Sequence, residues 1–181
     1  MPLPAEAARV ATFWRDAGPA MWFAKDPAFD AAFRDGFLDL HMQAARRACD
    51  GWAAGAEGAL ALLILLDQFP RNAFRGTGHM YATDPLARMF ARNGIADGLD
   101  GAVDEPLRLF LYLPFAHSED EADQEMSVLL SAPLPPPNPA HARRHRDIIH
   151  RFGRFPHRNP MLGRTATVEE QGFLDAGGYA G

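Results

Sequence analysis

The sequence predicts an all-α protein, an antiparallel array of seven or eight helices arranged as hairpins with short connections. Three observations predict this fold. Apolar residues recur at intervals of three and four along most of the chain, the spacing that gathers side chains on one helix face. Glycine, proline and Asp-Pro or Asn-Pro pairs separate these stretches, as they do at helix ends. No segment alternates apolar and polar residues in the manner of a strand.

The first half of the chain contains three well-marked helical segments. Residues 5–17 place apolar side chains on one face and stop at a Gly-Pro pair. Asp26-Pro27 combines a capping residue with a proline at the first helical position, and the apolar stripe that follows reaches Ala48. Residues 58–69 are apolar on every side, which is typical of a central buried helix, and we expect Pro70 to end it.

The second half repeats this pattern with shorter segments. We expect helices over residues 84–93, 106–114, 119–130, 139–152 and 167–176. Ser118 with Glu121, and Thr167 with Glu170, have the spacing of a capping box, which places two of these helix starts. The proline-rich stretch 132–139 is interpreted as a loop between hairpins. The predicted core includes Phe33, Phe37, Leu60, Leu63, Ile64, Leu65, Phe110 and Ile149.

Length, charge and cysteine content favour one cytoplasmic domain. At 181 residues the chain fits a single helical domain over residues 1–181. Its net charge of −5 disfavours binding to nucleic acid or to an anionic membrane. The one cysteine, Cys49, cannot form an internal disulfide, which suits a reducing cytosol. No signal peptide is evident, and the most apolar stretch, 59–66, is far shorter than the roughly 20 residues that cross a bilayer.

Two segments, 65–72 and 148–159, share a pattern. In each, an apolar helix runs into Phe-Pro and then Arg-Asn, followed by glycine and threonine, as a duplication of helical hairpins would produce. One interpretation is that the arginine and asparagine satisfy the open carbonyls of helix C-termini. The other is that both arginines line one cleft and bind an anion through paired hydrogen bonds.

Charged residues are also segregated along the second half. The acidic segment, 119–125, carries five carboxylates and no basic residue. The basic segment, 141–164, carries seven arginines and four histidines with a single acid. These segments either face and neutralise each other or contribute to a site.

The candidate site residues are polar groups that follow apolar helices, and we expect the polar corners of the chain to approach one another. His117 or His157 would be the general acid or base, with Glu119 or Asp67 orienting it. The predicted ligand-binding residues are Arg71, Asn72, Arg154, Arg158 and Asn159.

No metal ion or cofactor is expected. The chain has no Glu-x-x-His pair, no Cys/His cluster and no glycine-rich phosphate loop. His141 and His145 stand four residues apart, but His145 lies on an apolar stripe with Ile149 and Phe152. We therefore interpret His145 as a hydrogen-bonded core residue.

Several motifs taken together resemble a known family. They are Leu-Asp-Gln-Phe-Pro-Arg-Asn at 66–72, Ala-Thr-Asp at 82–84, Leu-Pro-Phe-Ala-His-Ser-Glu-Asp at 113–120, Arg-Phe-Gly-Arg-Phe-Pro-His-Arg-Asn at 151–159 and Leu-Gly-Arg-Thr-Ala-Thr-Val-Glu-Glu at 162–170. In that order they resemble the bacterial domain-of-unknown-function family numbered 924, over nearly the whole chain. The resemblance implies a helical fold related to tetratricopeptide-like hairpins and implies no activity.

Two functions are consistent with these patterns. One is the binding, with or without turnover, of a small anionic metabolite in a cleft lined by arginine, histidine and acidic side chains. The other is a noncatalytic helical-repeat scaffold that holds a partner protein or peptide. The sequence does not decide whether the protein is an enzyme, and it leaves a homodimer open.

Overall fold

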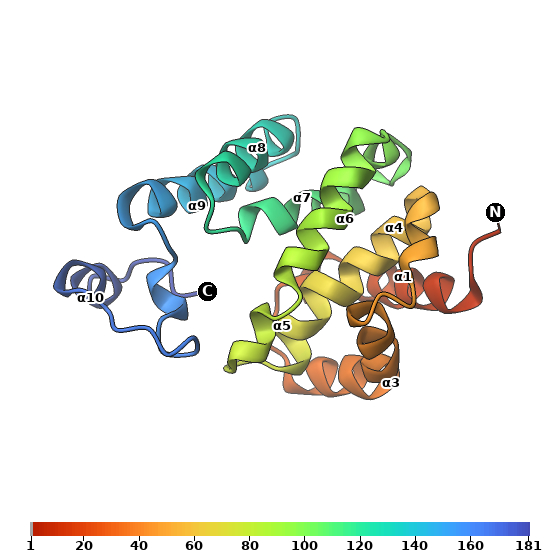
Figure 1. The fold of residues 1–181 in the computed structure, drawn as a ribbon, viewed down its shortest axis with the longest axis horizontal. Coiled ribbons are helices and arrows are strands. Elements are labelled where there is room, and N and C mark those ends of the chain that lie inside the picture. Colours follow the sequence, from red (N-terminus) through yellow and green to blue (C-terminus); the bar gives the residue numbers. More distant parts are fainter. Residues whose placement is uncertain (1) are drawn as a thin grey trace. The chain divides into compact units, whose positions relative to one another are not determined.

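The computed structural model describes residues 2–181, and none of these residues lies in a β-strand (Figure 1). The all-α prediction is therefore confirmed. The described chain forms two compact units. The N-terminal unit comprises residues 2–75 and 79–114, and the C-terminal unit comprises residues 76–78 and 115–181. No helix among the described residues is long and apolar enough to cross a membrane.

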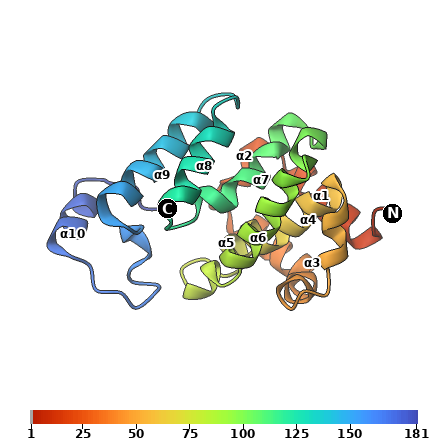
Figure 2. The ribbon, with the colours of Figure 1, turned by 45° about the horizontal axis from the view of Figure 1, so that its top comes forward.

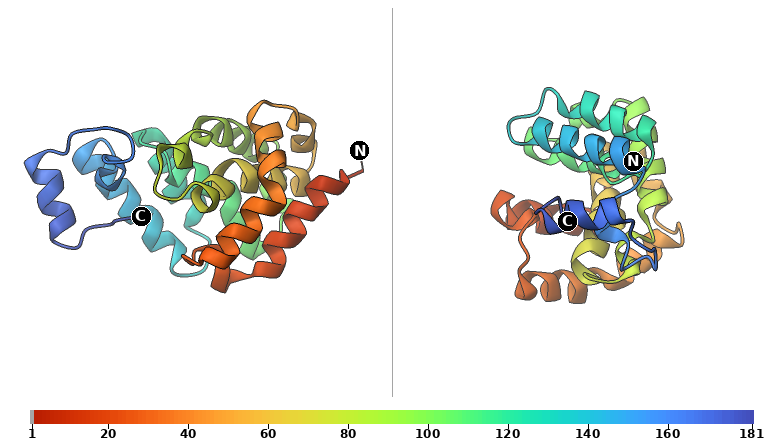
Figure 3. Two further views of the ribbon diagram at one scale, coloured as in Figure 1. Left: turned by 90° about the horizontal axis from the view of Figure 1, so that it is seen from below. Right: turned by 90° about the vertical axis from the view of Figure 1, so that its left-hand side faces the viewer.

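The N-terminal unit is built around its most apolar helix. Its elements are α1 (Ala5–Ala17), α2 (Pro19–Trp22), α3 (Pro27–Ala45), α4 (Ala56–Leu63), α5 (Phe69–Ala73), α6 (Asp84–Ala96) and the greater part of α7 (Glu105–Ala116). Helices α1 and α6 pack against α4, and α3 packs against α5. Helices α1 and α3 lie side by side (Figure 3), where the ring of Phe13 stacks on that of Phe33 at 5.2 Å.

The predicted core is buried throughout. Each of the residues predicted to lie in the core is at most 5% exposed: Phe33, Phe37, Leu60, Leu63, Ile64, Leu65, Phe110 and Ile149. The predicted start of α3 is also confirmed, since the Asp26 carboxylate accepts a hydrogen bond from the Phe29 amide at 2.8 Å. The described residues contain more helical segments than the seven or eight predicted, because α2 and α5 are single turns.

Helix α3 ends three residues before the predicted position. The Ala48 amide donates to the Gln43 carbonyl and the Arg47 amide to that of Ala44, the bond pair of a Schellman C-cap. Arg47 takes the left-handed conformation, φ 69°, that glycine usually supplies there. A side-chain pair with Asp50 at 2.7 Å holds this arginine in place. The left-handed conformation of Arg47 therefore ends α3, and no glycine marks this position in the sequence.

The central helix does not end at Pro70, which corrects the sequence prediction. Helix α4 continues through a π-helical turn, Ile64–Gln68, directly into α5. Helix α7 likewise continues past Pro114, where a break was predicted. Burial explains both cases, because Phe69 before Pro70 and Phe115 after Pro114 are each at most 1% exposed and tertiary packing holds the helix through the proline.

This continuity leaves two buried carbonyls without partners from the helix itself. The Phe69 amide donates to the Ile64 carbonyl, five residues back. Pro70 has no N–H to donate. The carbonyls of Leu65 and Leu66 therefore lack the amide donors that a regular helix would give them, and burial prevents water from replacing those donors.

Two side chains supply the missing donors. The His41 Nδ1–H donates to the Leu65 carbonyl at 2.9 Å, since a carbonyl can only accept. The Thr83 hydroxyl donates to the Leu66 carbonyl. Burial lowers the pKa of His41, so its imidazole is neutral and keeps this tautomer. Helix α3 and the residue before α6 are thereby hydrogen-bonded to the central helix.

The C-terminal unit consists of α8 (Glu121–Ser131), α9 (Asn138–Phe152), a 3₁₀ turn (Pro156–Arg158) and α10 (Val168–Asp175). Helices α8 and α9 lie side by side (Figure 2), and α10 packs against the 3₁₀ turn. The predicted capping box at the start of α10 is present, formed by Thr167 and Glu170.

The predicted cap of α8 is wrong by two residues. Asp120, rather than Ser118, is the N-cap, and its carboxylate accepts from the Asp123 amide at 3.1 Å. The Ser118 hydroxyl instead donates to the Asp123 carboxylate at 2.7 Å. Serine and aspartate are both common N-cap residues. Asp120 caps α8 because the amide of the buried Asp123 lies against its carboxylate.

We expect Thr83→Val to destabilise the protein by about 1–3 kcal/mol, because it leaves the buried Leu66 carbonyl without a donor while conserving side-chain shape. Urea unfolding followed by circular dichroism measures the change. Thr12→Val, at an exposed position on α1, is the matched control and should change stability by less than about 0.5 kcal/mol. Equal effects of the two substitutions would contradict this account of the π turn.

Candidate functional site

The Arg-Asn corner of the N-terminal unit is an internal ion-pair network. The Arg71 guanidinium makes two parallel bonds to the Asp84 carboxylate, at 2.8 and 3.0 Å. It also donates to the Asp67 carbonyl at 2.6 Å and lies 3.3 Å from the Asp67 carboxylate. Burial would lower the pKa of Arg71, but the two carboxylates outweigh it and raise that pKa. Arg71 is thus a fixed charge whose planar fork binds a carboxylate of the protein itself.

The neighbouring Asn72 and Arg75 join α5 and the turn after it to α3. The Asn72 side-chain amide donates to the Asp30 carboxylate at 2.7 Å. Arg75 makes two bonds to the same carboxylate, each at 2.9 Å. Since Asp67 is buried and accepts from Gln68 at 2.6 Å, all three predicted residues of this corner have protein partners. These contacts favour the structural interpretation for this corner.

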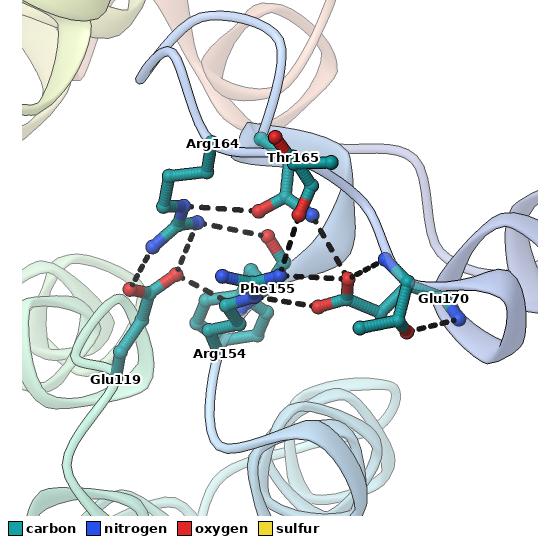
Figure 4. Close-up of polar contacts among 8 residues, drawn as sticks. Glu119, Arg154, Phe155, Arg164, Thr165 and Glu170 are labelled. Atoms are coloured by element: carbon teal, nitrogen blue, oxygen red, sulfur yellow. Dashed lines mark hydrogen bonds and ion pairs between the residues drawn. The ribbon is translucent and has the colours of Figure 1, made fainter.

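A second network, in the C-terminal unit, connects the start of α8 to the loop after α9 (Figure 4). The Arg164 guanidinium binds both oxygens of Glu119, at 2.6 and 3.0 Å. The Phe155 amide donates to the same carboxylate at 2.8 Å. Burial opposes ionisation of Glu119, but the Arg164 and Phe155 hydrogen bonds outweigh it and lower the pKa of Glu119.

Arg154 connects the same loop to Glu170 of α10 (Figure 4), and Asn159 also contacts Glu170. The Arg154 guanidinium donates to both oxygens of Glu170, at 2.6 and 2.8 Å. The Thr167 amide donates to Glu170 at 2.7 Å, completing the capping box. Asn159 donates to Glu170 at 3.3 Å and accepts from Arg164 at 2.9 Å. The Arg154 bonds hold the pKa of Glu170 at about 2.

The acidic and basic segments do face each other, as one of the two sequence interpretations required. Besides the Glu119 pair, His150 lies 3.3 Å from Glu121 and Arg146 lies 3.8 Å from Glu125. The latter contacts are exposed and contribute little to stability. These ion pairs account for most carboxylates of the acidic segment, but they do not involve several of the basic side chains.

Those side chains are four histidines around one buried arginine, His117, His141, His145, His157 and Arg158, which we call the His/Arg cluster. They come from the residue before Ser118, from α9 and from the 3₁₀ turn. Burial, then the charges of His117, Arg158, His141 and His157, lowers the pKa of His145 to about 3. Burial and then Arg158 lower the pKa of His157 to about 4. Both imidazoles are therefore neutral at neutral pH.

The buried polar groups of the His/Arg cluster have unusual surroundings. Arg158 is 6% exposed, and its guanidinium lies 4.5 Å from the centre of the Phe155 ring. The buried Nδ1 atoms of His145 and His157 have no hydrogen-bond partner within residues 2–181. Buried polar atoms in native proteins nearly always have a partner, and leaving one without costs about 1–3 kcal/mol. These two atoms beside a buried guanidinium make the His/Arg cluster the candidate site.

The structure thus places the sequence-predicted residues in two groups. Those in the N-terminal unit are Asp67, Arg71 and Asn72. Those in the C-terminal unit are His117, Glu119, Arg154, His157, Arg158 and Asn159. Within the second group, Glu119, Arg154 and Asn159 belong to the ion-pair network, whereas His117, His157 and Arg158 belong to the His/Arg cluster. Approach of the two groups to each other stays a prediction.

His145 belongs to the His/Arg cluster but was not among the residues predicted for a site. It is buried, as expected of a core histidine, but its Nδ1 is not hydrogen-bonded to any described residue. The sequence signal for this grouping is the four-residue spacing of His141 and His145, which is also the spacing of metal ligands on a helix. Among residues 2–181 no group of three or more His, Cys, Asp or Glu is placed to hold a metal.

Ser118 is hydrogen-bonded to two acidic residues at the start of α8. Its hydroxyl donates to Asp123 at 2.7 Å and accepts from the Asp120 amide at 3.2 Å. The Ser118 hydroxyl therefore links residues at the N-terminus of α8.

Comparison with known proteins extends over nearly the whole chain. The sequence profile of a family described as "Bacterial protein of unknown function (DUF924)" matches residues 10–178. A solved structure of a protein of unknown function from Agrobacterium tumefaciens is 58% identical and superposes with a TM-score of 0.92, covering 94% of this chain and 97% of that one. A search of curated proteins gives no match. The resemblance inferred from the motifs is confirmed.

We expect Glu170→Gln to destabilise the protein by about 2 kcal/mol at pH 7, because hydrogen bonds to charged groups contribute roughly 1.5–3 kcal/mol. The pKa of Glu170, about 2, lies below its unfolded value. The contribution is therefore complete above about pH 4.5 and is lost as pH falls toward 2. Unfolding of the variant and the wild type across this range should show the difference shrinking with acid.

Glu169→Gln is the matched control, since Glu169 makes an exposed pair with Arg151 at 2.9 Å. It should change stability by less than about 0.5 kcal/mol at any pH. A Glu170→Gln variant as stable as this control would contradict the ion-pair network.

Proposed function

This chain belongs to the DUF924 family of bacterial proteins of unknown function, and on that premise we propose that it binds a small anionic metabolite at the His/Arg cluster. The observation that carries the proposal is the pair of buried Nδ1 atoms, on His145 and His157, beside the buried guanidinium of Arg158. An anion would accept hydrogen bonds from both imidazoles in their Nδ1–H tautomers and lie beside the guanidinium.

The electrostatics of the cluster support an anion over a cation. The charges that act on His145 come from Arg158 and three other histidines, and each of them disfavours a further positive charge. The acid that acts on His157 is Glu119, whose own charge is balanced by Arg164. These neighbours favour a carboxylate or phosphate group over a cation beside His145.

Arg158 would be the anchor of such a ligand. Its guanidinium presents a planar fork that suits the paired oxygens of a carboxylate or phosphate. The Phe155 ring beneath it fixes the plane of that fork. A neutral His157 beside a bound acid group also has the protonation state that a general base needs, so His157 and His117 are the acid–base candidates should the ligand be turned over.

A noncatalytic scaffold that holds a partner protein is the second candidate function. Met126 and Leu129 lie one turn apart on the outer face of α8, and Leu129 is 68% exposed. An exposed apolar pair on a helix suits a protein contact, including a second copy of this chain. A tetratricopeptide-like arrangement of the hairpins belongs to this proposal, because helical repeats of that kind present such faces.

We expect sulfate, inorganic phosphate or succinate to raise the melting temperature of the protein. At a hundredfold excess over its dissociation constant a ligand stabilises by about 2.7 kcal/mol. For a domain of this size that amounts to roughly 5–10 °C in a thermal-shift assay. Neutral succinamide should produce no shift, because charge-assisted hydrogen bonds supply the affinity.

Arg158→Lys should abolish most of this response, since an ammonium group lacks the planar fork. Arg151→Lys is the matched control, because Arg151 is an exposed arginine on α9 that pairs with Glu169. Circular dichroism of both variants checks that they fold. Equal responses in the two variants, or no stabilisation by any anion of a broad panel, would overturn the proposal in favour of the scaffold.

A further inference from the structure

The chain changes direction directly after α10. The Gly177 amide donates to the Leu174 carbonyl at 3.0 Å and the Gly178 amide to the Phe173 carbonyl at 2.9 Å, the bond pair of a Schellman C-cap. Gly177 takes the left-handed conformation, φ 78°, that this cap requires. The cap therefore fixes the direction in which residues 179–181 leave α10.

Residues 179–181, which we call the strap, lie against the two histidines whose Nδ1 atoms are buried. The Tyr179 ring packs edge-on against His145, with 4.7 Å between ring centres, and against His157, with 5.1 Å. A Cβ added to Gly181 would come within 3.1 Å of His157 Cδ2, so this glycine also touches the imidazole. The strap thus covers both rings of the candidate site.

The strap is a single layer of chain laid on the C-terminal unit. Its anchor is the half-buried Tyr179 ring, which packs against the apolar cluster that includes Ile149 and Phe155. Ala180 and Gly181 are exposed. Segments that bury little apolar surface open locally at a smaller cost in free energy than the core around them. The strap can therefore open while α9 and the 3₁₀ turn stay folded.

We propose that the strap closes the anion site, so that Tyr179 has to move aside before an acid group reaches the Nδ1 atoms of His145 and His157. Because both atoms are buried, a covering segment must move to admit a ligand, and the strap is the covering segment that buries least. This inference rests on the proposed anion-binding function and adds its regulation. Arg144 on α9, whose guanidinium lies 5.5 Å from the centre of the Tyr179 ring, helps to hold the closed position.

Modification of histidines by diethyl pyrocarbonate at neutral pH, located by mass spectrometry, tests the cover without any ligand. The reagent attacks neutral imidazoles that solvent can reach. Tyr179→Ala should raise the modification rates of His145 and His157 several-fold, whereas His150, which is exposed on α9, should react alike in both proteins. Val168→Ala, at a 92% exposed position of α10, is the matched control and should change none of these rates.

Titration calorimetry with sulfate, compared with chloride at equal ionic strength, tests the closing of the site. A site that is open for a fraction of the time has its apparent affinity reduced by that fraction, so a strap closed for about nine-tenths of the time weakens binding about tenfold. We therefore expect Tyr179→Ala to bind sulfate more tightly than the wild type, by about tenfold on that scale. Val168→Ala should bind as the wild type does.

Gly178→Ala displaces the strap while keeping the Tyr179 ring. A Cβ at position 178 would lie 2.5 Å from the Phe173 carbonyl oxygen and from the edge of the Phe173 ring, so the chain has to shift where the strap begins. This variant should change histidine modification and sulfate affinity in the same direction as Tyr179→Ala. Circular dichroism checks that both variants are folded.

The possible outcomes separate the two proposals. Equal modification of His145 and His157 in the wild type and in both variants would show that the strap does not cover these rings, and would overturn the inference. Sulfate affinity that is unchanged or weaker in both variants would also overturn it, because Tyr179 would then be indifferent to the ligand or part of its site, while anion binding itself would stand. Absence of sulfate binding even in the variants with a displaced strap would overturn the anion site and its closing together.

Discussion

The carbonyl groups of Leu65 and Leu66 lack the amide donors that a regular helix would give them, and the N-terminal unit is arranged so that side chains of other elements supply donors. His41 donates from α3 and Thr83 from the residue before α6. Arg71 donates to the carbonyl of Asp67 while it pairs with Asp84. A buried polar group without a partner costs more than a hydrogen bond usually contributes, so this requirement fixes which elements must meet.

The same requirement shows what is unusual in the C-terminal unit. Its carboxylates Glu119 and Glu170 are each bound by a guanidinium and by a backbone amide, which together anchor the loop between α9 and α10. In the same unit the buried Nδ1 atoms of His145 and His157 have no hydrogen-bond partner among the described residues, and the same holds for Gln124 Oε1 and Ser127 Oγ. Because unsatisfied buried atoms in native proteins cluster where ligands or chemistry belong, the two Nδ1 atoms carry the functional argument.

Much of the fold could be predicted from the sequence, because helical periodicity and capping residues act locally. The Asp26 cap, the Thr167 capping box and the predicted core are all found in the structure. The failures concern long-range context. Pro70 is a local stop signal, yet burial carries the helix through it. His145 looks like any core histidine until the charges brought from distant residues are known.

A structure of the protein crystallised with sulfate at mildly acidic pH tests the central claim most directly. The account predicts a sulfate ion within hydrogen-bond distance of Arg158 and of the Nδ1 atoms of His145 and His157, at high occupancy. It would be contradicted by an ion that binds elsewhere, or by imidazoles whose Nδ1 atoms are hydrogen-bonded to other groups of the protein while the ion is absent.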